Sequence, residues 1–244
     1  MKVGRLWEID ALRGSAIVAM VVYHLAWDLN YLGFYHGDVT AGLWLLFQKA
    51  ILTTFVFLVG VSLWLGYARM RRVRFTAYLS RGLKILVWGI LITVVTRLFL
   101  GEGTVFFGVL HLIGFALIFA YPFLRFGAGN LVFGAAFIAA GNYFARITVD
   151  FPWLVWLGLS PPDLYMVDYV PVFPWFGVVL VGIGAGCIFY PRGARLIRLK
   201  EIPSARAVRL LTYLGYRSLV IYLVHQPVLF GFLYSWKGFA GGPP

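Results

Sequence analysis

Apolar runs long enough to cross a lipid bilayer recur along this chain, and they restrict its fold more than any other feature. The hydrocarbon core of a bilayer is ~30 Å thick and takes about 20 residues of α-helix to cross. Because a helix pairs its own backbone groups where lipid cannot, we predict an all-α polytopic integral membrane helix bundle of about seven spans, in a single domain over 1–244. The runs lie at about 11–33, 44–68, 83–100, 104–124, 128–146, 171–190 and 210–234.

The basic residues give this bundle an orientation. They gather near the N-terminus, at 69–84 and at 192–209, whereas the acids lean toward the alternate segments. Cytoplasmic loops carry the excess of Lys and Arg, so we predict the N-terminus inside and the C-terminus outside. The same distribution accounts for the net charge of +12, so no nucleic-acid partner is expected.

A polar stripe runs down the first apolar segment. It consists of Asp10, Arg13, His24 and Asp28, which share one face at ~100° per residue. Lipid cannot solvate such a stripe, so it should face other protein or a wet cavity. His24 and Asp28 stand four residues apart, and the carboxylate could orient the imidazole and stabilise its charged form. We predict that these two residues are catalytic, with Asp10 in support. The alternative is an interface anchor at Arg13 and a packing histidine at His24.

A cationic segment follows the second apolar run, with no acid among its residues. Together with Arg13 it could bind the phosphates of a cofactor. His24 lies eleven residues beyond Arg13, about 16 Å along a helix, a distance that a pantetheine arm could cross. The alternative is topology control or contact with anionic lipid headgroups. The predicted cofactor-binding residues are Arg13, Arg69, Arg71, Arg72 and Arg74.

Other polar positions within or next to the spans are weaker candidates. His111, Arg217 and His225 each fit packing as well as a supporting role at a site. Tyr23, Asn30, His111 or backbone amides could stabilise an oxyanion, and the sequence does not choose among them. His36 follows the first span and should be solvated unless the proline-rich outer segment 147–171 covers it. No spacing of metal ligands is present, so no metal site is expected.

Four ordered motifs resemble a known family over nearly the whole chain. The opening Glu8–Gly14 with Tyr23-His24 is similar to the transmembrane acyltransferase superfamily, whose acyltransferase-3 branch carries Arg, ten residues and then His on its first helix. With Phe55–Ser62, Phe173–Gly177 and Ser218–Pro227 added, the chain more closely resembles bacterial membrane proteins of the heparan-alpha-glucosaminide N-acetyltransferase catalytic-domain type.

The resemblance implies an enzyme of a bacterial cytoplasmic (inner) membrane that takes an acetyl or other acyl group from cytoplasmic acyl-CoA. The group would pass to a hydroxyl or amine acceptor, such as a saccharide, at the outer face. Carried over, His24 would be the catalytic base or acyl carrier, and Arg13 a cofactor-side cation. In the glucosaminide enzyme an asparagine stands at the position of His24 and the catalytic histidine comes later, which points to His36. The choice between His24 and His36 stays open, as do direct transfer and an acyl-histidine intermediate.

Two other functions fit the same residues. A transporter or flippase for a lipid-linked or anionic small molecule could use the polar stripe as its pathway. A membrane cytochrome could use His24, His111 and His225 as haem ligands. Acyl length, acceptor and oligomeric state cannot be predicted from the sequence, and a homo-oligomer is compatible with it.

Overall fold

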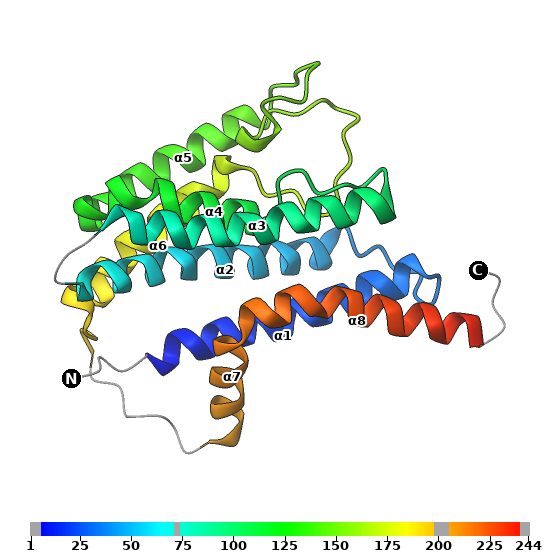
Figure 1. The fold of residues 1–244 in the computed structure, drawn as a ribbon, viewed down its shortest axis with the longest axis horizontal. Helices are drawn as coiled ribbons and strands as arrows, with labels where there is room; N and C mark the ends of the chain where they lie inside the picture. Colours follow the sequence, from blue (N-terminus) through cyan, green and yellow to red (C-terminus); the bar gives the residue numbers. More distant parts are fainter. Residues whose placement is uncertain (1–5, 71–73, 198–204, 240–244) are drawn as a thin grey trace. The chain divides into compact units, whose positions relative to one another are not determined.

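The computed structural model describes residues 6–70, 74–197 and 205–239. Within these ranges the regular structure is entirely helical, and six helices are long and apolar enough to cross a membrane. The predicted all-α polytopic membrane fold is confirmed. The α-helices are α1 (Trp7–Tyr31), α2 (Gly42–Arg69), α3 (Phe75–Leu100), α4 (Val109–Phe119), α5 (Asn130–Phe144), α6 (Val172–Phe189), α7 (Arg206–Tyr216) and α8 (Ser218–Phe239). Three 3₁₀ segments, η1 (Tyr121–Gly129), η2 (Val155–Leu157) and η3 (Pro191–Gly193), complete the set (Figure 1).

Two of the predicted spans differ from the helices that form. The run predicted at 104–124 is α-helical only over the 11 residues of α4. Before it the chain loops, because Gly101 and Gly103 adopt positive φ angles. After it, Pro122 lies in the first turn of η1, which joins α5 to make another candidate span, Tyr121–Phe144. The short α4 therefore does not by itself reach across ~30 Å of hydrocarbon.

The predicted last span, 210–234, divides at Arg217 into α7 and α8. Arg217 is the C-cap of α7, and its backbone N–H donates to the carbonyls of Tyr213 and Leu214. Serine follows it and begins α8, which is long enough to span alone. The apolar pattern runs through the break, so hydropathy alone joined an amphipathic helix to a membrane span.

The chain contacts divide the protein into two compact units, 1–55 with 199–244 and 56–198. In the first unit α1 packs against both α7 and α8 (Figure 1). Its core is formed by Ile17, Met20, Tyr23 and Ile51. Gly14 of α1 faces the backbone of α7 at Leu211, and Gly215 of α7 faces the backbone of α1 at Asp10, so the two helices cross without side chains between them.

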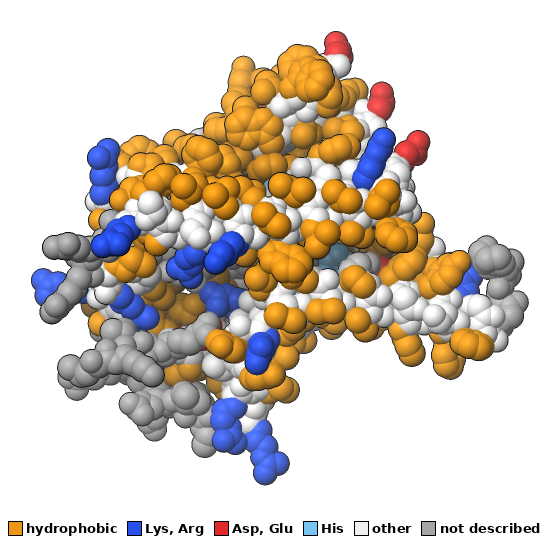
Figure 2. Space-filling model, in the orientation of Figure 1, with side chains coloured by type: hydrophobic (Ala, Val, Ile, Leu, Met, Phe, Trp, Pro, Cys, Tyr) orange, Lys and Arg blue, Asp and Glu red, His pale blue; other side chains and the backbone are white. Residues whose placement is uncertain are grey.

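The second unit packs α5 on α6 and α3 on α4. The second half of α2 joins it where Gly60 faces Val179 and Gly182 of α6, again without intervening side chains. Figure 2 shows hydrophobic side chains along the visible face of α3 and α5, with acidic side chains only toward the loop end of these helices. An apolar exterior of this kind is what lipid requires of a spanning helix.

Candidate functional site

Two histidines from different helices meet in the first unit. The imidazoles of His24 on α1 and His225 on α8 have ring centroids 4.8 Å apart and an interplanar angle of 63°, an edge-to-face contact. Tyr23 places its ring edge-on to His24, with centroids 5.8 Å apart. We call His24, Asp28, His225 and Gln226 the histidine cluster. The direct contact of the two rings leaves no room for a porphyrin between them.

Asp28 joins the cluster through an amide side chain. Its side chain is 0% exposed, and Oδ1 accepts a hydrogen bond from Gln226 Nε2 at 2.7 Å. Among the described residues no hydrogen bond connects this carboxylate to the imidazole of His24, the partner expected from the i,i+4 spacing. Asp28 therefore ties α1 to α8, and through that tie it positions His24 opposite His225.

The tautomer of His225 is set by the backbone. Its Nδ1 lies 2.7 Å from the carbonyl oxygen of Tyr222, which can only accept, so Nδ1 carries the proton. Nε2 is then unprotonated and can only accept a hydrogen bond, and it is buried with no hydrogen-bond partner. Asp28 Oδ2 and Gln226 Oε1 are likewise buried without a partner. Buried acceptors left unpaired are costly and need an explanation, and three in one cluster suit a bound group that donates hydrogen bonds.

The bond between Asp28 and Gln226 gives a stability prediction. Gln226→Leu would leave a fully buried carboxylate without its donor, and we expect a loss of about 1–3 kcal/mol. Asp28→Leu combined with Gln226→Leu removes both polar groups and should recover most of that loss. Thermal unfolding in detergent would compare the two. A double variant that is less stable than the single one would contradict this account.

The N-terminal end of the polar stripe forms an ion pair. Arg13 Nη1 lies 3.0 Å from Asp10 Oδ1, and Asp10 is only 5% exposed. The structure thus puts Asp10, Arg13, His24 and Asp28 at buried or half-buried positions of α1. Asp10 neutralises part of the charge of Arg13 and fixes the guanidinium near the N-terminal end of the helix.

The C-terminal end of α1 is followed by a hydrogen-bonded loop. Asn30 Nδ2 donates to the carbonyls of Tyr35 at 2.9 Å and Gly37 at 2.7 Å. Both amide hydrogens are committed to this loop, which leaves Asn30 without a donor for an oxyanion. His36 lies within the loop and is exposed. It stands outside the histidine cluster.

His111 belongs to the second unit and links α3 to α4. Its Nδ1 accepts from the backbone N–H of Gly108 at 3.2 Å, so Nε2 carries the proton and donates to Thr93 Oγ1 at 3.3 Å. The Thr93 hydroxyl in turn donates a hydrogen bond to the carbonyl of Val105 at 2.6 Å. Both ring nitrogens are therefore used in hydrogen bonds that hold the start of α4. This arrangement favours the structural role for His111 over a supporting role at a site.

The predicted cationic segment is described only in part. Arg69 donates from Nε and Nη2 to the carbonyl of Gly193, at 3.0 and 2.9 Å, and so ties the end of α2 to η3. Arg74 is exposed at the N-cap of α3. Arg71 and Arg72 lie outside the described residues. Arg217 lies at the break before α8, with its guanidinium over the ring of Tyr216 and not in the histidine cluster.

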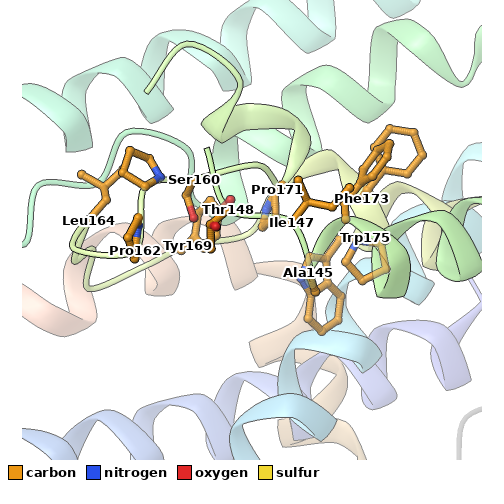
Figure 3. Close-up of a pocket in the computed structure, with 15 residues that line it drawn as sticks. Ala145, Ile147, Thr148, Ser160, Pro162, Leu164, Tyr169, Pro171, Phe173 and Trp175 are labelled. Carbon is orange, nitrogen blue, oxygen red and sulfur yellow. The ribbon is translucent and has the colours of Figure 1, made fainter. Parts of the chain in front are cut away.

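A separate cavity of about 390 Å³ lies in the second unit, between α5, α6 and the proline-rich segment 147–171 (Figure 3). No charged side chain lines it, and Thr148, Ser160 and Tyr169 supply its hydroxyl groups. The Tyr169 hydroxyl donates to the carbonyl of Val155 at 2.9 Å, and burial raises the pKa of this phenol. Within the described ranges no group of three or more His, Cys, Asp or Glu side chains could hold a metal ion.

Helices of bilayer length that carry two half-buried histidines, a buried carboxylate and a half-buried amide define an integral membrane protein with a polar site inside its helix bundle. Residues 5–227 match the model of the family described as heparan-alpha-glucosaminide N-acetyltransferase, catalytic, and the chain belongs to that family. The family resemblance of the sequence motifs is thereby confirmed, and membership implies a transmembrane acetyltransferase. The comparison with curated proteins and that with solved structures found no match.

Proposed function

We propose that this protein transfers an acetyl group from acetyl-CoA to an amine or hydroxyl acceptor, of saccharide type, at the outer face of a bacterial cytoplasmic membrane. The observation that carries the proposal is the histidine cluster, with its two contacting imidazoles and three unpaired buried acceptors. An acceptor N–H or O–H supplies the donors that these atoms lack. The family match supports acetyl transfer as the reaction.

The proposed chemistry is general base catalysis on a thioester. The neutral imidazole of His24 takes a proton from the acceptor nitrogen or oxygen, which attacks the thioester carbonyl. The carbon–sulfur bond breaks, and the thiolate of CoA leaves and is protonated. In the alternative path the His24 nitrogen attacks first and carries the acetyl group as acyl-histidine before the acceptor takes it. His225 lies against His24 and can accept the second hydrogen of an amine at Nε2.

An assay in sealed proteoliposomes tests the reaction. Radiolabelled acetyl-CoA is supplied on one side and glucosamine, as the probe acceptor, on the other. Release of free CoA together with labelled N-acetyl product supports the proposal. Label that crosses the membrane without CoA release would instead indicate a transporter, and a Soret band in the purified protein would indicate a haem protein.

Donor binding is proposed for Arg13, at the end of α1 that the basic residues mark as cytoplasmic. Arg13→Ala removes a charged hydrogen-bond donor, and such bonds are worth about 1.5–3 kcal/mol. We expect the KM for acetyl-CoA to rise about 10- to 100-fold, with a much smaller change in kcat. Arg146→Ala removes an equal charge from the predicted outer side and should leave KM unchanged. An equal rise in both variants would mean that the effect is one of overall charge.

A further inference from the structure

Helix α7 does not run parallel to the spans of its own unit. Figure 1 shows α7 crossing α1 near the N-terminal end of α1. The crossing is at Gly14 and Gly215, where the two backbones touch. If the candidate span α1 crosses the bilayer, a helix that crosses α1 at this end would lie along the membrane surface rather than through the hydrocarbon.

The two faces of α7 differ in what they contact. Gly215 is buried against α1, and Leu211 and Leu214 are half-buried on the same side. On the opposite face, exposed residues recur every three to four positions, which is the spacing of residues on one face of a helix. Leu210 and Tyr213 are each 58% exposed on this outward face. Its exposed members are Arg206, Arg209, Leu210, Tyr213, Tyr216 and Arg217.

The outward face combines apolar and cationic groups. Figure 2 shows basic side chains beside hydrophobic ones over α7. α7 contains no acid. Leucine and tyrosine suit the boundary between acyl chains and headgroups, while arginines beside them bind phosphate. In water the apolar surface of the leucine and tyrosine would stay exposed, and a zwitterionic bilayer would offer the arginines phosphates but no net negative charge.

We propose that the outward face of α7 binds anionic phospholipid headgroups at the membrane surface, with Leu210 and Tyr213 seated at the acyl boundary and Arg206 and Arg209 on the phosphates. Charge complementarity and the crossing at Gly14 carry the proposal, and it does not depend on the reaction that the protein catalyses. The surface is the one toward which the basic residues of the chain are biased, where anionic lipids attract polybasic segments.

Spin labels measure the depth of α7 directly. In the Cys187→Ser background, which removes the single cysteine, Leu210→Cys and Thr40→Cys carry a nitroxide in nanodiscs. Thr40 is an exposed loop residue in the same unit and serves as the aqueous control. We expect the label at 210 to be several-fold more accessible to oxygen than to a water-soluble nickel chelate, and the label at 40 to show the reverse. Equal nickel accessibility at both positions would overturn the proposal.

A second measurement tests the charges. Nanodiscs of phosphatidylcholine alone are compared with nanodiscs that contain phosphatidylglycerol. The label at 210 should lie deeper in the anionic discs, and Arg206→Gln with Arg209→Gln should abolish that difference. An equal depth of the label in both kinds of nanodisc would overturn the proposal. Strong dipolar broadening between labels at 210 would also overturn it, because a second copy of the chain would then occupy this face.

Discussion

His24→Ala is expected to reduce acetyl transfer from acetyl-CoA by about 10²- to 10⁴-fold, the range that a positioned general base contributes. The imidazole of His24 contacts His225 and no hydrogen bond in the described structure requires it, so the variant should still fold. Transfer of label to glucosamine measures the loss, and the melting temperature in detergent checks the fold.

His36→Ala is the matched control for this prediction, because His36 is an exposed histidine in the loop that follows the same helix. It should keep nearly wild-type turnover. The opposite pattern, with His36→Ala inactive and His24→Ala active, would move the base to the outer loop. Full activity in both variants would contradict a role for either histidine.

Gly215→Val is expected to have the largest effect on stability. A Cβ at this position would overlap the backbone carbonyl of Asp10, which cannot rotate away. Overpacking costs about 1–3 kcal/mol where side chains can adjust, and more where only backbone can move. We therefore expect α7 to separate from α1 and the melting temperature to fall sharply.

Gly231→Ala is the control for that variant. Gly231 lies in α8 of the same unit, and a Cβ there meets nothing within 4 Å. Alanine favours a helix over glycine by about 0.8–1 kcal/mol, so this variant should be as stable as the wild type or slightly more so. A Gly215→Val protein that melts with the control would show that the crossing of α1 and α7 is looser than described.

The sequence was sufficient to predict the helical membrane fold, because the length of an apolar run, taken as a helix, can be compared directly with the thickness of a bilayer. It was not sufficient at Arg217, where the apolar pattern continues through a break in the helix. Nor was it sufficient at α4, where Gly101, Gly103 and Pro122 shorten the helix although the run from Val105 to Leu124 is almost entirely apolar. In both places the backbone conformation determines where the helix ends, and hydropathy carries no information about backbone conformation.

The site was predictable only along one helix. Periodicity placed His24 and Asp28 on a common face of α1, but the hydrogen-bond partner of Asp28 is Gln226, 198 residues away in the chain. The one available signal was an amide next to His225 in an apolar span, since such a group needs a partner there. Which helix supplies that partner depends on packing, which one sequence does not reveal.

Helix α1 is fastened at two levels, by bare backbone against α7 at Gly14 and by the carboxylate–amide bond to α8 at Asp28. The two fastenings are fourteen residues apart, about 21 Å along the axis. Because α1 is held by neighbouring helices at both positions, it cannot slide or rotate independently of them. His24 lies between the two contacts and therefore keeps its position against His225.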